Sequence, residues 1–318
     1  MEQLVSTPGT WSAFLAVAGG MGLLFGGGEV LVAGSTRLAV RLGMNALLIG
    51  LTVVAFGTSM PELFVSLAAS LQNHPDLMVG NVVGSNIANI GLVLALAALV
   101  APISISFAEI RRELYLVLLT SLLVLAIGLQ GSFSRFWGLF FVAGLLFFTY
   151  YSFREANQAK KNNGPAVPQA TSSLPKILAM ITAGLVALAF GSNLFIHGAV
   201  VLARHFGVSE LVIGLTMAAI GTSLPELASS IAAARRGEAA LLTGNILGSN
   251  LFNLMLVMGS TAAITPFVFA ATVRYRDLPI MLGFALALLP ILKFRQQIQR
   301  RHGILLLGAY ALYLWLLA

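Results

Sequence analysis

Cysteine is absent from this 318-residue chain, and charged residues make up only 9% of it. Without cysteine the chain can form no disulfide, use no catalytic thiol and bind no metal through a thiolate. Histidine is scarce as well, because the chain has four and all of them lie outside the repeated motifs described below. A zinc or copper site is therefore not expected, since both metals favour sulfur or imidazole ligands.

Apolar residues dominate instead. They account for 58% of the chain, and the mean hydropathy is +0.93. The apolar runs are far longer than those of soluble domains. The first run has no basic stretch ahead of it and exceeds the apolar core of a signal peptide, so we interpret it as a membrane span. We expect an all-α integral membrane protein whose main partner is the lipid bilayer.

The apolar runs predict ten transmembrane helices, because about 20 apolar residues cross a membrane as a helix. Loops between successive spans then alternate between two sides, of which one receives 14 of the 18 Lys and Arg residues and the other receives 4. The expected spans lie near residues 11–36, 44–72, 77–100, 114–129, 136–153, 177–203, 208–234, 239–264, 278–292 and 303–317.

This uneven charge predicts the orientation. Cytoplasmic loops carry an excess of Lys and Arg, so the basic side is expected in the cytoplasm and both termini on the outer side of the plasma membrane. The net charge of +7 then meets anionic lipid headgroups rather than nucleic acid. We infer no obligatory protein partner.

Two segments repeat at an offset of 164 residues. Residues 47–62 read LLIGLTVVAFGTSMPE and residues 211–226 read LVIGLTMAAIGTSLPE, with 11 of 16 positions identical. The same offset carries GNVVGSNIANI (80–90) onto GNILGSNLFNL (244–254). The offset steps over five spans, an odd number, so the second half enters the membrane upside down relative to the first. Inverted repeats of this kind build the midplane binding sites of secondary transporters.

One non-apolar segment, REANQAKKNNGPAVPQATSSLPK (154–176), separates the halves. Its three prolines, its glycine and its low hydrophobicity predict a flexible cytoplasmic linker, too short for a folded domain. We expect residues 1–153 to form the first five-span repeat and residues 177–318 the second, inverted one.

Each copy of the GTSxPE motif gathers oxygen donors at a helix break. Pro61 has no N–H, so the carbonyl of Gly57 loses its helical partner and the helix should open there. Glu62 is costly in a bilayer unless it has a partner or a task. Thr58 and Ser59 are spaced to share a face with Glu62. The second copy supplies Gly221, Thr222, Ser223, Pro225 and Glu226.

Neutral acceptors follow in the third and eighth spans, at every fourth residue and hence on one helical face. Facing halves would offer more oxygens than one small ion needs, and all-oxygen sites suit Ca²⁺ and Na⁺. Any one of these residues could be purely structural, but a duplicated cluster favours an ion site. The two sets are Asn81, Ser85 and Asn89, and Asn245, Ser249 and Asn253.

Other small or polar residues have structural interpretations. Gly43 with Asn45, and Gly207 with Ser209, fit a helix stop followed by an N-cap. The glycines of the first span favour tight helix packing. Glu29 serves either a cation pathway or a hydrogen bond to a neighbouring helix, and the sequence favours neither.

The two G-T-S-x-P-E and the two G-N-x-x-G-S-N-x-x-N segments resemble the signatures of the cation/calcium exchanger superfamily, which includes the sodium/calcium exchangers. The match spans nearly the whole chain and is most similar to compact prokaryotic members. It implies alternating access, with the first and sixth helices moving against the rest. It also implies cation ligands at Ala55, Thr58, Ser59, Glu62, Ser85 and Asn89, and opposite them at Ala219, Thr222, Ser223, Glu226, Ser249 and Asn253, with the two alanines acting through their carbonyls.

The chain departs from the typical exchanger at Asn89 and Asn253, because at least one of these positions usually holds Asp. Its core therefore has two carboxylates, which balance one Ca²⁺ or two Na⁺, although a close pair can also exchange protons. We expect a Ca²⁺/Na⁺ antiporter, with Ca²⁺/H⁺ or another cation exchange as the alternative. No cofactor is expected beyond the transported ions.

Two other classes are less favoured. Broken helices also suit a passive channel, but the full inverted duplication with two carboxylates suits alternating access better. An intramembrane enzyme using Glu62 and Glu226 as an acid/base pair would need a nucleophile or an activated water. The sequence shows no intramembrane histidine pair, no Ser–His pairing and no paired-Asp motif.

Overall fold

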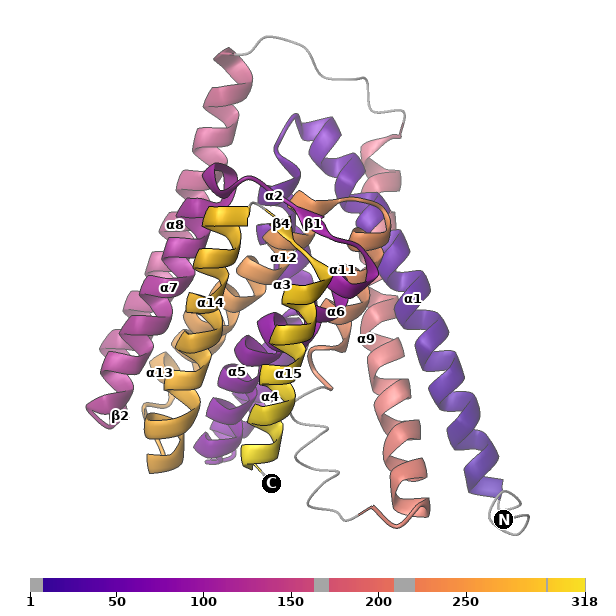
Figure 1. Ribbon diagram of the computed structural model, residues 1–318, viewed down its shortest axis with the longest axis vertical. Helices are drawn as coiled ribbons and strands as arrows, with labels where there is room; N and C mark the ends of the chain where they lie inside the picture. Colours follow the sequence, from indigo (N-terminus) through magenta and orange to yellow (C-terminus); the bar gives the residue numbers. More distant parts are fainter. Residues whose placement is uncertain (1–7, 163–171, 209–220, 296, 318) are drawn as a thin grey trace.

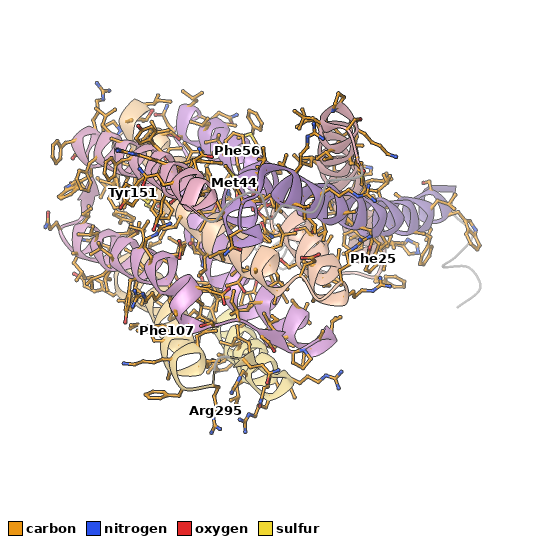
Figure 2. All side chains as sticks on the ribbon, turned by 90° about the horizontal axis from the view of Figure 1, so that it is seen from above. Phe25, Met44, Phe56, Phe107, Tyr151 and Arg295 are labelled. Atoms are coloured by element: carbon orange, nitrogen blue, oxygen red, sulfur yellow. The ribbon has the colours of Figure 1, made fainter. Side chains whose placement is uncertain are left out.

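The fold is a bundle of helices that run roughly along the long axis of the molecule (Figure 1). Seen from above, its outer surface carries many exposed apolar side chains; Phe25 and Tyr151, for example, are each nearly half exposed (Figure 2). Such a surface suits contact with lipid. The computed structural model describes residues 8–162, 172–208, 221–295 and 297–317.

The first half begins with one long helix, continues with two interrupted spans and ends with two regular helices. Short π-helical turns, written η, lie inside the interrupted spans. In chain order the elements are α1 (Pro8–Leu42), α2 (Ala46–Ile49), η2 (Gly50–Val54), α3 (Ala55–Thr58), α4 (Met60–Leu71), α5 (Pro75–Ala88), η3 (Asn89–Leu94), α6 (Ala95–Val100), β1 (Ile103–Ser104), α7 (Phe107–Leu129), β2 (Ser132–Phe133) and α8 (Arg135–Asn162).

The second half repeats much of this order over its described residues. The elements are α9 (Leu174–His205), α11 (Leu224–Arg235), α12 (Ala239–Leu251), η4 (Phe252–Val257), α13 (Met258–Ile264), β3 (Phe267–Val268), η5 (Val273–Asp277), α14 (Leu278–Arg295), β4 (Gln297–Ile298) and α15 (Arg300–Leu317). The break before α11 matches the break at Ser59, and the turn η4 matches η3, by the offset of 164, whereas the turn η5 before α14 has no counterpart before α7.

Among the described residues, seven helices are long and apolar enough to cross a membrane, and one bent pair makes an eighth candidate. The bent pair joins residues 46–58 to residues 60–71 at 45°. The expected tenth span corresponds to α15, and the expected seventh span, 208–234, lies partly outside the described residues. A multi-pass helical membrane protein is confirmed, whereas the number ten stays a prediction.

The centre of the bundle is formed by the interrupted third and eighth spans. In Pro75–Val100 and Ala239–Ile264, 78% and 94% of the most apolar window is buried, against 33% for α1 and 22% for α9. The polar third and eighth spans thus lie inside, and the glycine-rich α1 with its counterpart α9 lies at the edge.

Helices α1 and α9 pack against each other in antiparallel fashion through glycines spaced by seven residues. A Cβ at Gly27 would lie 3.0 Å from the carbonyl oxygen of Gly184, and one at Gly20 would lie 2.8 Å from that of Gly191. These glycines are repeat-related, since Gly20 matches Gly184 and Gly27 matches Gly191. Small residues let the two backbones touch, as membrane helix pairs commonly do.

Two short antiparallel strand pairs tie the halves together. Strand β1 pairs with β4, and β2 pairs with β3. Each pair joins a loop of one half to a loop of the other. The start of α1 and the end of α15 lie at one end of the bundle, and the end of α8 and the start of α9 lie at the other (Figure 1). We call the latter the basic end, because it carries the 14 Lys and Arg residues counted above.

The helix boundaries differ from expectation at the linker. Residues 154–162 continue α8, and α9 already begins at Leu174. The sequence REANQAKKN consists mostly of good helix formers. It extends a helix that is already formed, so no new helix nucleus is needed. The predicted cap at Asn45 is confirmed, because its side chain accepts a hydrogen bond from the backbone N–H of Leu47 at 3.0 Å. Ser209 lies outside the described residues.

Candidate cation-binding site

The predicted helix break is present in both halves and has the same backbone conformation. Ser59, between α3 and α4, has φ −85° and ψ 4°, and Ser223, before α11, has φ −84° and ψ 3°. Pro61 and Pro225 each follow within the first turn of the new helix. The missing N–H of proline opens the helix there and aims the start of the next helix inward.

Glu62 and Glu226 occupy the first turns of α4 and α11, and both residues are 0% exposed. Two carboxylates are thus held inside the bundle, away from its outer surface. A helix N-terminus favours negative charge, which stabilises each carboxylate in part.

Repeat-related hydrogen bonds join the halves around these glutamates. The hydroxyl of Thr58 lies 3.4 Å from the amide oxygen of Asn245, and Thr222 donates to the amide oxygen of Asn81 at 3.2 Å. In each half the asparagine amide nitrogen then donates to a serine of the preceding helix. These bonds are Asn81 to Ser66 at 2.9 Å and Asn245 to Ser230 at 3.2 Å.

The bonds to the glutamates themselves are not symmetric. Ser59 and Ser249 donate to Oε1 of Glu226, at 3.2 and 3.5 Å. The matching bonds to Glu62 are absent among the described residues, and Ser85 instead lies 3.4 Å from the hydroxyl of Thr222. Ser59 therefore reaches across to the other half. Thr58 donates at 3.1 Å to the carbonyl of Val54 in its own half and lies 3.4 Å from Asn245. The expectation that both hydroxyls would bond to Glu62, because they share a helical face with it, is not met among the described residues.

Several buried polar atoms here have no hydrogen-bond partner among the described residues. Buried polar groups are normally paired, so a cluster of unpaired oxygens needs an explanation, such as a bound cation or water. The cluster is rich in acceptors, which is what a hard cation requires. It consists of both carboxylate oxygens of Glu62, Oε2 of Glu226, Oδ1 of Asn89, the hydroxyl of Ser223, and Oδ1 and Nδ2 of Asn253.

The two central asparagines differ in the same way. Asn89 donates to the side chain of Asn250 at 3.1 Å, whereas Asn253 makes no such bond within the described part of the chain. Asn86, which corresponds to Asn250 by the repeat offset, donates from its Nδ2 to the carbonyl of Val82 in its own helix at 2.8 Å. Asn89 opens the π-helical turn η3, and Asn253 lies in η4. Such turns are frequent at functional sites.

Among the twelve residues predicted as ligands, Ser59 and Ser249 donate to Glu226, and Ser85 lies beside Thr222. Five others are buried on the same interrupted spans, and their role as ligands stays a prediction: Thr58, Glu62, Asn89, Ser223 and Asn253. The carbonyl of Ala55 accepts from the backbone N–H of Ser59 at 3.0 Å, so it is also part of the break. Ala219 lies outside the described residues. Sequence reasoning missed Ser66 and Ser230, which orient the asparagines. Ser66 and Ser230 are related by the repeat offset of 164, and this match could have identified them from the sequence.

Among the described residues, no three His, Cys, Asp or Glu side chains are grouped so that they could hold a metal ion together. The negative charge of the cluster therefore comes from Glu62 and Glu226, and its remaining donors are neutral. Two charges with many neutral oxygens fit Ca²⁺ or Na⁺ better than metals that need nitrogen or sulfur.

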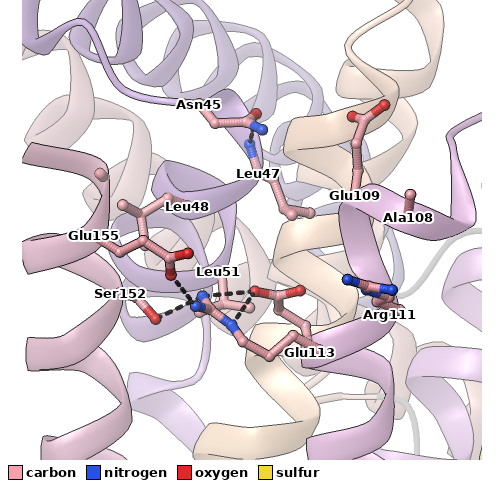
Figure 3. A pocket seen from close by; sticks show the side chains of 12 residues that line it. Asn45, Leu47, Leu48, Leu51, Ala108, Glu109, Arg111, Glu113, Ser152 and Glu155 are labelled. Carbon is pink, nitrogen blue, oxygen red and sulfur yellow. Dashed lines mark hydrogen bonds and ion pairs between the residues drawn. The ribbon is translucent and has the colours of Figure 1, made fainter. Parts of the chain in front are cut away.

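A separate polar pocket of about 350 Å³ lies at the basic end, lined by residues of α2, α7 and α8 (Figure 3). Arg112 fills it by donating to Glu113 at 2.9 Å, to Ser152 at 2.9 Å and to Glu155. This network joins α7 to α8. Each of its acceptor side chains is paired with a guanidinium group, unlike the unpaired acceptors of the central cluster.

The family model described as "Sodium/calcium exchanger protein" matches residues 12–154 and 176–318. The chain is 38% identical to "Putative antiporter CaxA" of Alkalimonas amylolytica, over 96% of this chain and 98% of the relative. It is 30% identical to "Sodium/calcium exchanger MaX1" of Methanosarcina acetivorans, over 95% and 97%.

A solved structure of the sodium-calcium exchanger NCX_Mj, soaked without Na⁺ and Ca²⁺, has a similar fold. Its TM-score is 0.85 at 30% identity, with 97% of this chain and 100% of that chain covered. A second structure of the same exchanger, soaked with Na⁺ and Sr²⁺, gives a TM-score of 0.83 at 29% identity, over 95% and 97%.

Proposed function

The chain belongs to the sodium/calcium exchanger protein family, and on that premise we propose that it is a secondary active antiporter that exchanges Ca²⁺ for Na⁺ by alternating access. The observation that carries this proposal is the buried cluster of unpaired oxygens around Glu62 and Glu226. Relatives and neighbours that cover nearly the whole chain are named for sodium and calcium. Transport, rather than catalysis, is the activity that this site supports.

We assign the two glutamates to charge balance and the neutral oxygens to completing the coordination shell. Two carboxylates balance one Ca²⁺ or two Na⁺, so the ions would compete for one cluster. Their unpaired oxygens support this role. The proposed ligands are the side chains of Thr58, Ser59, Glu62, Ser85, Asn89, Thr222, Ser223, Glu226, Ser249 and Asn253, with the carbonyls of Ala55 and Ala219.

The moving part in this proposal is the pair α1 and α9. These helices pack tightly on each other and lie at the edge of the bundle, with far less buried surface than the spans that hold the cluster. A pair of this kind can shift past a fixed site and expose it to alternate sides, as inverted-repeat transporters do.

Membrane orientation and domain limits are part of the same proposal. We place the basic end in the cytoplasm and both termini outside, following the 14 to 4 division of Lys and Arg. Residues 1–153 and 177–318 are the proposed repeats, with 154–176 between them. The protein would act in the plasma membrane with inorganic cations as substrates and without a protein partner or a resident cofactor.

The test is ⁴⁵Ca²⁺ uptake into proteoliposomes, with an outward Na⁺ gradient or an outward H⁺ gradient at clamped voltage. We expect the Na⁺ gradient to drive uptake. Uptake driven only by H⁺ would instead make this chain a Ca²⁺/H⁺ exchanger, which the names of its relatives do not favour. Uptake that needs no counter-ion would indicate a channel and contradict exchange.

A further inference from the structure

Glu29 forms an ion pair between two parts of the molecule that exchange would move past each other. Its Oε2 lies 2.7 Å from Nε of Arg236, and its Oε1 lies 3.8 Å from a guanidinium nitrogen of Arg235. Glu29 lies in α1, and the arginines end α11. Of the two roles that the sequence left open for Glu29, the structure favours the bond to a neighbouring helix.

In the proposed motion the two helices belong to different parts of the molecule. Helix α1 is joined to α9 through the glycine contacts described above, whereas α11 begins at Leu224 and carries Glu226 in its first turn. An ion pair between α1 and α11 therefore fixes the proposed moving pair to the part that holds the site.

Next to Glu29, the backbone of α1 packs directly against the backbone of α11. A Cβ at Gly28 would lie 2.8 Å from the carbonyl oxygen of Ala228, two residues beyond Glu226. The contact lies between the basic end and the cluster, because Arg235 and Arg236 lead into the α11–α12 loop at that end (Figure 1). The related helices α9 and α4, both fully described, do not pack along each other in this way.

The repeat offset shows that this ion pair has no copy in the other half. Glu29 corresponds to Asn193, Arg235 to Leu71 and Arg236 to Gln72. None of these three side chains is ionisable, so the matched contact at the opposite end cannot form a charged pair. The two halves are otherwise repeats of each other, but at these positions an ion pair forms at the basic end alone.

We propose that Glu29 and Arg236 are positioning residues for exchange, and that their ion pair is a latch that holds the basic end closed and favours the state open to the opposite side. This latch rests on the exchange proposed above. Both side chains are partly exposed, at 32% and 41%, so the bond is modest. Partly exposed ion pairs of this strength shift a two-state equilibrium about two- to fivefold.

The first test measures opening directly. The natural chain has no cysteine, so an Ala228→Cys variant carries one thiol, at a buried position whose backbone carbonyl contacts α1. We expect Glu29→Gln to raise its alkylation rate by an impermeant maleimide from the basic side about two- to fivefold. Arg236→Gln should do the same, and Arg235→Gln should have less effect because its bond is longer. An alkylation rate unchanged by Glu29→Gln and by Arg236→Gln would overturn the latch.

The second test measures exchange from each side in oriented proteoliposomes. Breaking the latch should change the ratio of the two apparent KM values for Ca²⁺ about two- to fivefold in favour of the basic side, since apparent affinity follows the population of the competent state. The charge swap Glu29→Arg with Arg236→Glu should restore the ratio. Asn193→Glu with Gln72→Arg should build the latch at the opposite end and move the ratio the other way.

These readouts separate the two proposals. If both KM values change together while their ratio stays constant, Glu29 has a merely structural role and the latch is wrong. If the unmodified chain shows no counter-ion-dependent uptake but Glu29→Gln still speeds alkylation, the latch stands as a gate and the proposed Ca²⁺/Na⁺ exchange is contradicted.

Discussion

The two halves of this chain are nearly identical in design but unequal at the centre. Thr58 with Asn245, and Thr222 with Asn81, make the same contact across the interface. Glu226, however, accepts hydrogen bonds from two serines, while both oxygens of Glu62 lack a partner among the described residues. The duplicated sequence places the same residue types in both halves, but the arrangement of the halves determines which side chains form hydrogen bonds.

This difference gives the two glutamates unequal surroundings. Two serine hydroxyls hold Oε1 of Glu226 in place, whereas no described residue holds either carboxylate oxygen of Glu62. A preorganised ligand costs less entropy on binding than one that must first be ordered. Substitutions at repeat-related positions therefore show which residues act alike in the two halves and which do not.

The largest effects are expected at Glu62 and Glu226, and here the halves should behave alike. Glu62→Gln and Glu226→Gln each remove one of the two charges that we propose balance Ca²⁺. Losing one charged interaction of about 3 kcal/mol lowers Ca²⁺ affinity by about 100-fold. ⁴⁵Ca²⁺ binding and uptake, with thermal unfolding to confirm that each variant folds, check this. Retained exchange in both variants would refute the assigned ion site.

The glycine contact between α1 and α9 should also respond symmetrically. Gly27→Leu and the repeat-related Gly191→Leu force a side chain into backbone that lies about 3 Å away. Overpacking of this kind costs about 1–3 kcal/mol, which lowers the melting temperature. The adjacent Gly26→Leu is the matched control, because no described atom lies within 4 Å of its Cβ. Equal melting temperatures for Gly26→Leu and Gly27→Leu would exclude tight packing there.

Much of the fold could be predicted because its determinants are local or repeated. Long apolar runs define membrane helices, and Pro61 and Pro225 mark the two breaks wherever the surrounding helices lie. The repeat then links one half to the other. For the same reasons the sequence placed Glu62 and Glu226 at the two helix breaks, where both are buried.

The pairing of these groups could not be predicted, since it depends on three-dimensional distances between halves. Nothing local distinguishes Asn89, which bonds to Asn250, from Asn253, which makes no matching bond to Asn86. The partner of Glu29 was hidden for the same reason, because it lies 207 positions further along the chain. The helical extension of residues 154–162 was missed because the linker was predicted as one segment from its low hydrophobicity and its prolines, all of which lie after residue 162.

Asn89 and Asn253 should differ in their effect on stability. Asn89→Ala leaves the buried Oδ1 of Asn250 without its donor, which costs about 1–2 kcal/mol. Asn253→Ala removes an amide that has no partner among the described residues, so without ions it should cost less. Each variant creates a similar cavity, and their difference in melting temperature isolates the hydrogen bond. If Asn253→Ala is the more damaging in ion-free buffer, Asn253 has a partner that this arrangement does not include.

The smallest effect is expected at Ser59 and Ser223. These two serines are repeat-related, and they differ in whether the hydroxyl has a partner. Ser59 donates to Glu226 at 3.2 Å, whereas the hydroxyl of Ser223 has no partner within the described residues. In the absence of Ca²⁺ and Na⁺, Ser59→Ala should therefore lower the free energy of unfolding by about 1 kcal/mol and Ser223→Ala by nearly nothing. With saturating Ca²⁺ the two should converge, because both hydroxyls are then proposed to bind the ion. Thermal unfolding with and without Ca²⁺ measures both differences. Equal losses in ion-free buffer would mean that the halves are symmetric after all, and that the unequal pairing of the two glutamates does not persist in solution.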